Sequence, residues 1–447
     1  MMPSQARILF VTTTHWPHAT KLCLALADVG LDVMAVAPKD HALHKVSSIS
    51  TECIGRSRRQ ATASIAAAIN RHCPRITIPG DEIAIDCLRA IYARAIRGLG
   101  SKPWRLTKHI EDSLGAPSSF AFGRQKSRLI HLAREEGLLT PETEVLRDVN
   151  HLCELIADRT FPLVLKCDDG FGGRGVRIVT NRREAEQAFF ELRANAGGRG
   201  ALKQAIRDLD VAPLARFWHK APLITLQSYV DGRPANRAIV CSQGQVLSGL
   251  SVEVIRTLYS NGPSTVIRVI DSQEMKRATT RLASRLALSG FVGFDFMLER
   301  STDRPYLLEM NLRPTGISHL AFDRDTDLIR ALVMSLTGLL VHREMSANAC
   351  RPVALFPLEL WRDPASPYLK LACHDVPWRC PEVLEAYRVP VPADSDWLRS
   401  MLDRTRNVLR KFAYGSAPAG VASGTANASG NCCDAGLKSQ WQRSDGG

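Results

Sequence analysis

Residues 290–316 read GFVGFDFMLERSTDRPYLLEMNLRPTG, two apolar runs on either side of a polar turn at residues 299–304. Apolar runs of this length separated by a short polar segment predict a β-hairpin with a longer loop. The rest of the sequence is interpreted around this hairpin, because it carries polar side chains within strands that are otherwise built for a core.

Side chains alternate between the two faces of a strand, so Glu309 and Asn311 are predicted to share one face. Leu307 is expected beside them, and the core side of this strand is expected to consist of Tyr306, Leu308 and Met310. On the preceding strand Asp295 is the only charge in an aromatic run. The hairpin is therefore expected to present two carboxylates and an amide together.

Two interpretations of this polar face stay open on the hairpin alone. Carboxylates are costly to bury unless they are paired or bound to a metal, and Mg²⁺ prefers one or two carboxylates together with substrate phosphates. Charged residues are mostly exposed in proteins, so a solvated rim on an edge hairpin is an equally reasonable reading. The remaining motifs decide between them.

Composition and charge limit the class of protein. The chain has 447 residues, 45% of them hydrophobic, which is enough for two or three globular domains. Lys and Arg number 58 against 45 Asp and Glu, a net charge of +13 that favours anionic ligands. The surplus is spread out, with its densest early cluster at Arg56, Arg58 and Arg59. Nucleic-acid binding is therefore a minor hypothesis.

The twelve cysteines show no paired spacing that would indicate zinc. The N-terminal run ILFVTTT is too short for a signal peptide, and no window is apolar enough for a membrane span. We expect a cytoplasmic protein without a membrane span.

The first hundred residues alternate strands and helices, which predicts a small parallel, Rossmann-like sheet. Its first turn lacks GxGxxG, so a dinucleotide site is not expected. Ligands of open α/β sheets bind beyond the carboxyl ends of the strands, where Thr13, Thr14, His15 and Asp81 fall. Capping of helices explains the same residues equally well.

A glycine-rich hairpin loop follows a strand that ends in Lys166. The loop reads DDGFGGRGV from Asp168, and its glycines would let backbone N–H groups approach an anion closely. Lys166 adds a point charge at its base. GK[ST] is absent, so this is not a Walker A loop.

The C-terminal third contains three weaker signals. Residues 353–361 (VALFPLELW) resemble a strand, and residues 396–412 a basic amphipathic helix. His374 and Asp375 are either a structural pair, which we favour, or a contribution to an active site. From residue 413 the composition predicts a disordered tail.

The order of these motifs resembles the ATP-grasp superfamily of carboxylate–amine ligases over about residues 1–320. A Rossmann-like start is followed by a Lys126-headed helix ending in G-x-x-T-P, then FPLVLKCDDGFGGRGV, a Q-x-Y-V strand end and LLEMNLRPTG. The last stretch and the glycine-rich hairpin carry most of the resemblance.

The resemblance implies a fold and a site. The expected architecture is α/β and α+β: a Rossmann-like domain (1–122), an ATP-grasp domain of two α+β subdomains (123–342, with a lid at about 140–226), a C-terminal add-on (343–412) and a tail (413–447). ATP would contact Lys126 and Lys166, the lid glycines Gly172, Gly173 and Gly175, and the hinge residues Gln227, Tyr229, Val230 and Asp231. Asp295, Glu309 and Asn311 match the Mg²⁺ (or Mn²⁺) ligands, and Arg313, assisted by Arg256, matches the catalytic arginine.

One departure concerns the hinge. Members of the superfamily usually carry Glu or Lys there and an acidic residue a few positions on for the ribose, where this chain has Pro234 and Ala235. Asp231 is the carboxylate that could substitute for it.

The implied activity is an ATP-dependent, Mg²⁺-requiring ligase that activates a small carboxylate as an acyl phosphate for attack by an amine. Phosphoryl transfer needs positioning and charge neutralisation more than a covalent catalyst, which suits these residue types. The alternative is a nucleotide-binding regulatory or scaffold protein that has lost turnover. Small-molecule substrates and a possible homo-oligomer are the expected partners.

Overall fold

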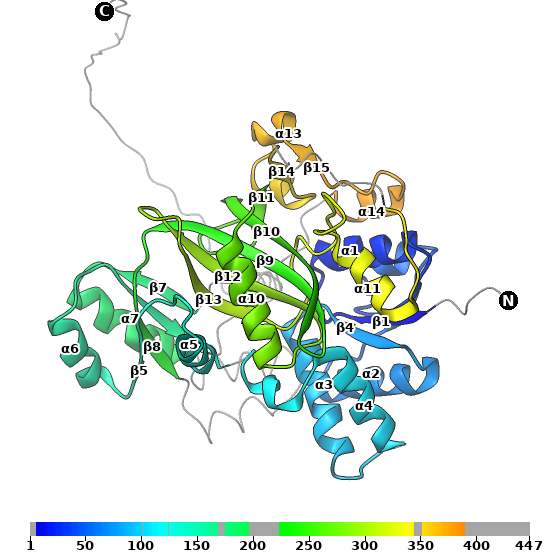
Figure 1. Cartoon of the computed structure of the whole chain (residues 1–447), viewed down its shortest axis with the longest axis horizontal. Coiled ribbons are helices and arrows are strands. Elements are labelled where there is room, and N and C mark those ends of the chain that lie inside the picture. The colour runs from blue at the N-terminus through cyan, green and yellow to red at the C-terminus, as the bar shows by residue number, and fades with distance from the viewer. Residues whose placement is uncertain are drawn as a thin grey trace, which may run out of the picture. The chain divides into compact units, whose positions relative to one another are not determined.

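The computed structural model describes residues 6–100, 102–123, 125–168, 175–195, 223–343 and 351–388. Their strands form three sheets, of four, seven and four strands (Figure 1). This mixed architecture is the α/β and α+β fold that the sequence predicts. None of the helices in the described ranges is long and apolar enough to cross a membrane.

The N-terminal sheet is parallel, in the order β3-β2-β1-β4. Its strands are β1 (Arg7–Val11), β2 (Asp32–Ala37), β3 (Ser50–Cys53) and β4 (Ile76–Pro79). Strands β2 and β3 are added on one side of β1, and β4 is added on the other side. The strand order therefore reverses between β1 and β4, and open α/β sheets bind ligands at the carboxyl ends of the strands at such a point. The Rossmann-like prediction is confirmed, although β3 was not foreseen because its residues, STEC, lack an apolar run.

Helices cover both faces of this sheet. One face packs on α1 (Pro17–Asp28), and the other on α2 (Arg58–His72), α3 (Glu82–Ala95) and α4 (Pro103–Leu114). The fully buried side chains of Ile8 and Phe10 point to the α1 side, whereas Leu9 and Val11 point to the other. This alternation within an all-apolar strand is typical of a sheet that is buried on both faces.

The second four-stranded sheet is antiparallel and has the order β5-β8-β6-β7. It consists of β5 (Thr143–Leu146), β6 (Leu163–Cys167), β7 (Val176–Val179) and β8 (Ile224–Ser228), covered by α6 (Val149–Ala157) and α7 (Arg182–Asn195). Helix α5 (Lys126–Glu135) precedes it.

The large sheet has the order β13-β12-β9-β10-β11-β14-β15. Its long strands are β9 (Gly232–Ser242), β10 (Gln245–Thr257), β11 (Ser264–Val269), β12 (Gly290–Glu299) and β13 (Pro305–Asn311). One face packs on α10 (Gln273–Arg285) and the other on α11 (Leu328–Thr337) (Figure 1). The predicted hairpin at residues 290–316 is thus confirmed as β12–β13.

The C-terminal part differs from its prediction. Residues 353–361 were expected to form one strand, but only β14 (Val353–Ala354) is extended, and α12 (Leu358–Arg362) follows Pro357. Proline lacks the N–H that a continuing ladder needs, which ends the strand there. Short elements complete this part, namely α13 (Tyr368–Leu371), β15 (Cys373–His374) and α14 (Pro381–Ala386). The predicted helix at 396–412 and the tail from 413 lie outside the described residues.

Candidate active site

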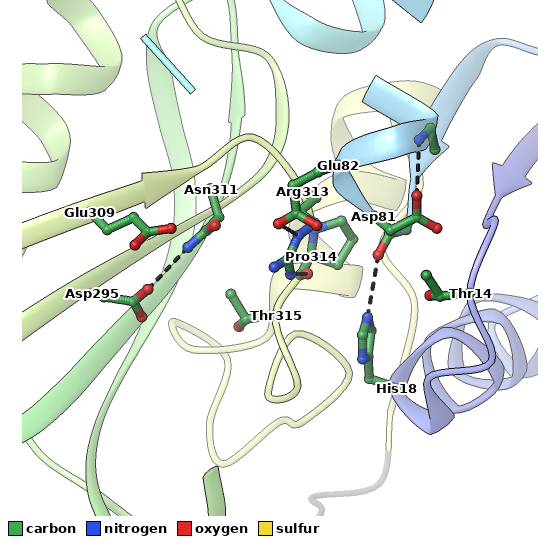
Figure 2. Close-up of polar contacts among 12 residues, drawn as sticks. Thr14, His18, Asp81, Glu82, Asp295, Glu309, Asn311, Arg313, Pro314 and Thr315 are labelled. Carbon is green, nitrogen blue, oxygen red and sulfur yellow. Dashed lines mark hydrogen bonds and ion pairs between the residues drawn. The ribbon is translucent and has the colours of Figure 1, made fainter. Parts of the chain in front are cut away.

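The polar face of the hairpin is a row of side chains across three neighbouring strands. Asn236 on β9, Asp295 on β12 and Glu309 on β13 are directly opposite one another in the sheet register. Asp295 Oδ1 accepts a hydrogen bond from Asn236 Nδ2 at 2.6 Å, and Oδ2 accepts one from Asn311 Nδ2 at 3.0 Å. Figure 2 shows Asp295, Glu309 and Asn311 gathered at this end of the hairpin. The three residues that the sequence predicts as metal ligands are brought together.

A β-bulge in β13 corrects one part of the prediction. Glu309 lies opposite Asp295, but Leu307 lies opposite Phe296, so Leu308 is an extra residue. Leu307 is consequently fully buried in the core with Met310 rather than beside Glu309, and Leu308 is only half-buried. The backbone N–H of Leu307 donates to the carbonyl of Leu139, a contact that holds the bulge.

The environment of Asp295 disfavours its charged form. Burial, together with the negative charge of Glu309, raises the pKa of Asp295 to about 6. The amide hydrogen bond from Asn236 and the charge of Arg313 act in the opposite direction but do not restore the ordinary value. Asp295 is therefore poorly stabilised in its charged form, and it forms no ion pair with any described residue.

Both predicted phosphate lysines lie at this acidic pair. Lys126 Nζ, at the start of α5, is 3.0 Å from Glu309 Oε2. Burial would lower the pKa of Lys126, but the charge of Glu309 raises it overall. Lys166 on β6 experiences the charges of Glu309, Lys126 and Asp295, and burial lowers its pKa to about 8. Two lysines and two carboxylates therefore share one electrostatic site, although they come from four different elements.

Of the glycine-rich loop only Asp168 and the end from Gly175 are described. Gly172 and Gly173 lie outside the described residues, whereas the carbonyl of Gly175 accepts a hydrogen bond from Cys167 N at 2.9 Å. That bond continues the β6–β7 ladder beyond Lys166, so the loop is the hairpin connection that the sequence predicts.

The predicted hinge links the small sheet to the large one. Gln227 is buried, and its amide donates to Thr143 Oγ1 at 2.9 Å, so this side chain is used structurally. Tyr229 is 39% exposed, and Asp231 pairs with Arg300 through two hydrogen bonds of 2.9 and 3.2 Å. A cleft of about 430 Å³ lies here, lined by residues 228–231 (Val230 included) and 299–301 with Pro141, Glu142 and Tyr306.

The two predicted arginines have different positions. Arg313 follows β13 directly and donates from Nε to Glu82 Oε1 at 2.6 Å, as Figure 2 shows. Its charge affects Asp295, so it belongs to the site. Arg256 is exposed near the end of β10, with its guanidinium carbon 5.6 Å from the centre of the Tyr368 ring. The structure therefore does not bring Arg256 to the acidic pair.

The residues predicted at the end of the parallel sheet are mostly engaged with one another. Asp81 is the N-cap of α3 and accepts hydrogen bonds from Ala84 N and from Thr13 N and Oγ1. His15 Nε2 lies 2.9 Å from Asp40 Oδ1. The capping interpretation therefore accounts for Asp81, while Thr14 is half-buried near Asp81 (Figure 2).

Sequence reasoning missed three residues of the site. Asn236 is one polar residue in a strand of alternating character, Glu82 is an ordinary acid in the first turn of a helix, and Thr315 Oγ1 approaches Asn236 Oδ1 at 3.4 Å. Only the strand register and the packing of α3 identify them, and neither leaves a local signal in the sequence.

Residues 125–317 match the family model of the ATP-grasp domain. The chain therefore contains an ATP-grasp domain over these residues. The part matching the ATP-grasp family model contains both lysines, the hinge, the carboxylates and both arginines discussed above. It excludes the N-terminal parallel sheet and the C-terminal part.

Known proteins with the ATP-grasp fold resemble the chain at low identity. Acetyl-CoA carboxylase of Schizosaccharomyces pombe is 25% identical over 159 residues, which is 34% of this chain but 6% of the relative's own length. Two solved structures share the fold. The biotin carboxylase domain of a Hydrogenobacter thermophilus 2-oxoglutarate carboxylase, in complex with MgADP and bicarbonate, has a TM-score of 0.53 and 14% identity, covering 75% of this chain and 71% of that one. An L-amino acid ligase from Bacillus licheniformis has a TM-score of 0.51 and 16% identity, covering 78% and 79%.

Proposed function

We propose that this protein is an ATP-dependent, Mg²⁺-requiring ligase. It would activate a carboxylate substrate as an acyl phosphate for attack by an amine or a similar nucleophile, with release of ADP and phosphate. The observation that carries the proposal is the acidic pair of Asp295 and Glu309, bridged to Lys126 at 3.0 Å and electrostatically coupled to Lys166. The match of residues 125–317 to the ATP-grasp family model supports the general class of reaction.

The acidic pair fits Mg²⁺. Two carboxylates and an amide oxygen are hard oxygen ligands, and Asp295 forms no ion pair with any described residue. Among the described residues no group of three or more His, Cys, Asp or Glu side chains could hold a metal alone. This suits Mg²⁺, which usually completes its coordination with substrate phosphates and water. Asp295, Glu309 and Asn311 would hold the ion, and when bound it would neutralise charge on the phosphates.

The nucleotide would lie between the small sheet and the hairpin. Lys126 and Lys166 would contact its phosphates, and Gly172, Gly173 and Gly175 would cover them. The backbone at Gln227, Tyr229 and Val230 would hold the base, and Asp231 the ribose. Asp231 would have to leave Arg300 or share it, since the two side chains are paired in this structure.

The chemistry is a pair of displacements. An oxygen of the substrate carboxylate attacks the γ-phosphorus, the bond to the β-phosphate oxygen breaks, and ADP leaves. The amine then attacks the acyl carbon, loses a proton, and phosphate leaves. Lys166 and Arg313 would neutralise charge that builds on the transferred group. Arg256 would assist Arg313 only after moving away from the Tyr368 ring.

One observation favours the second candidate, a nucleotide-binding protein without turnover. The hinge has Pro234 and Ala235 where an acidic residue is expected, and the substitute, Asp231, is already paired with Arg300. This candidate predicts nucleotide binding but no ADP release with any substrate.

A hydroxylamine trap separates the two candidates. The full-length protein is incubated with MgATP, hydroxylamine and a panel of carboxylates, and ADP and hydroxamate are measured together. The ligase predicts both products with at least one carboxylate and their loss in Glu309→Gln. The matched control is Glu274→Gln, an exposed acid in the first turn of α10. Nucleotide binding without either product across the panel would favour the second candidate.

A further inference from the structure

Arg313 is held by a residue from outside the ATP-grasp domain. Its Nε donates to Glu82 Oε1 at 2.6 Å, and its Nη1 donates to the carbonyl of Pro314 at 3.2 Å. A guanidinium has five N–H groups in a rigid plane, so two fixed contacts determine how the rest are aimed. Within the described part of the chain Nη2 has no hydrogen-bond partner. This nitrogen is the donor that remains for a ligand.

Glu82 is itself firmly placed. It is the first residue of α3, directly after the N-cap Asp81, whose carboxylate accepts hydrogen bonds from Thr12, Thr13 and Ala84. The negative charge of Glu82 lies at the helix N-terminus, where the helix dipole favours it. Burial would raise the pKa of Glu82, but the charge of Arg313 lowers it overall, so the pair stays ionised at neutral pH.

Other contacts also join the N-terminal part to the rest of the chain. Ala116 N donates to the carbonyl of Ala287 at 3.0 Å, and Gly115 and Leu288 form a β-bridge. Lys21 of α1 is paired with Asp375 in the C-terminal part. The side chains of Arg313 and Glu82 are only 22% and 31% exposed, next to the carboxylates. Because other contacts join the same parts of the chain, the placement of the pair at the carboxylates points to a role in addition to holding these parts together.

We infer that Glu82 is a positioning residue that orients the Arg313 guanidinium so that Nη2 meets the phosphoryl group being transferred. The inference rests on the proposed function. Asp295 and Glu309 would hold the metal beside that group, and Arg313 would contact the group itself. Figure 2 shows Arg313 and Glu82 between the carboxylates and His18 of α1. Helix α3 of the N-terminal part thus contributes to phosphoryl transfer through Glu82.

A rival role for Glu82 makes the opposite prediction. If Glu82 were only a counter-ion, removing it would leave the charge of Arg313 uncompensated and would strengthen anion binding at this site. If it positions Arg313, removing its acceptor oxygen frees the side chain. Immobilising such a side chain again on binding weakens the phosphoryl contact by about three- to tenfold.

The test uses calorimetry on the full-length protein with two probes, MgADP and MgADP with aluminium fluoride, which mimics the transferred phosphoryl group. The variants are Glu82→Ala, Glu82→Gln, Arg313→Ala and the double variant Glu82→Ala/Arg313→Ala. Asp32→Asn is the matched control, because Asp32 forms an ion pair of the same 2.6 Å length with Arg7 in the same sheet.

We expect Glu82→Ala, Glu82→Gln and the control Asp32→Asn, which all keep Arg313, to retain saturable MgADP binding, which also shows that they are folded. The fluoride-dependent gain of each variant is measured relative to its own MgADP affinity. The extra affinity due to aluminium fluoride should fall about three- to tenfold in Glu82→Ala. Gln keeps an acceptor oxygen and should restore most of it, and the double variant should be no worse than Arg313→Ala.

Three outcomes would overturn the inference: unchanged or stronger fluoride-dependent binding in Glu82→Ala, additive losses in the double variant, or no fluoride-dependent gain in the wild type. Failure of the wild type to bind MgADP would instead refute the proposed function itself.

Discussion

Two aspartates of this protein, Asp375 and Asp295, differ in how their negative charge is balanced. Asp375 lies where α1 meets the C-terminal part, and its Oδ2 accepts from Lys21 and from His319 Nε2, the latter at 2.9 Å. Its Oδ1 accepts from Phe356 N. Burial alone would raise the pKa of Asp375, but Lys21 and His319 hold it well below its ordinary value.

Asp295 is the contrasting case. Its partners are two neutral amides, its nearest charged neighbour is another carboxylate, and its pKa is raised to about 6. Both acids sit in well-packed surroundings, so burial does not distinguish them. The difference teaches that an acid satisfied by protein cations supports the fold, whereas an acid left short of positive charge marks a ligand site.

The largest expected effect is the loss of unfolding free energy when Asp375 is removed from Lys21 and His319. Asp375→Ala leaves Lys21 and His319 buried without their shared carboxylate, and breaking a buried pair from one side costs about 3–5 kcal/mol of unfolding free energy. Asp295→Asn should cost less in the absence of ligand, because it loses one of two amide hydrogen bonds but also removes the repulsion from Glu309. Denaturant unfolding of the two variants checks the contrast, which fails if Asp295→Asn is the more destabilising.

The pH dependence of stability should have opposite signs at the two acids. The folded pKa of Asp295 is raised, so its contribution is fully present below pH 4 and is lost as pH rises through about 6, by up to about 3 kcal/mol. The folded pKa of Asp375 is depressed, so its contribution is present above pH 4 and is lost as pH falls. Unfolding profiles of wild type minus Asp295→Asn and wild type minus Asp375→Asn measure both. Profiles of the same sign would contradict the comparison.

A smaller effect is expected from crowding the site directly. A Cβ added to Gly293 on β12 would lie 2.1 Å from Thr315 Cγ2, so Gly293→Ala must displace the side chain of Thr315, two residues after Arg313. We expect about 1–3 kcal/mol of destabilisation, as for other overpacked positions, together with weaker MgATP binding. Thermal unfolding and calorimetry measure the two. Unchanged nucleotide binding would separate this loop from the site.

The smallest effect is expected at the exposed acid of the hinge. Asp231→Asn removes the ion pair with Arg300, which is open to solvent, so the unfolding midpoint should not move measurably. Any loss of MgATP affinity in this variant would then reflect the proposed ribose contact. The change of Asp231 to Asn is nearly isosteric, so a large shift in the midpoint would show that the pair supports the hinge.

Local signals predicted the parts of the fold that depend on local sequence. Apolar runs, turn residues and strand periodicity predicted the β12–β13 hairpin and the alternation of strands and helices in the N-terminal part. They also predicted that Asp295, Glu309 and Asn311 lie together on the hairpin. The bulge at Leu308 was not predictable, because it depends on the N–H of Leu307 reaching Leu139, far away in the sequence.

The same limit applies to the site. Asn236 reaches Asp295 only through the pairing of β9 with β12, and Glu82 and Arg313 are 231 residues apart. The resemblance to the ATP-grasp superfamily implied that Arg256 assists Arg313, but its guanidinium lies over the ring of Tyr368, which belongs to a part of the chain with weak sequence signals. The positions of these site residues depend on contacts between segments that are distant in the sequence, and such contacts leave no local pattern from which to predict them.

MgATP calorimetry on the wild type and Glu309→Gln tests the central claim most directly. The account predicts saturable binding by the wild type that needs Mg²⁺, and its collapse in Glu309→Gln while the variant remains folded. Equal binding with and without Mg²⁺, or no binding by folded wild-type protein, would contradict the assignment of the acidic pair as a metal–nucleotide site.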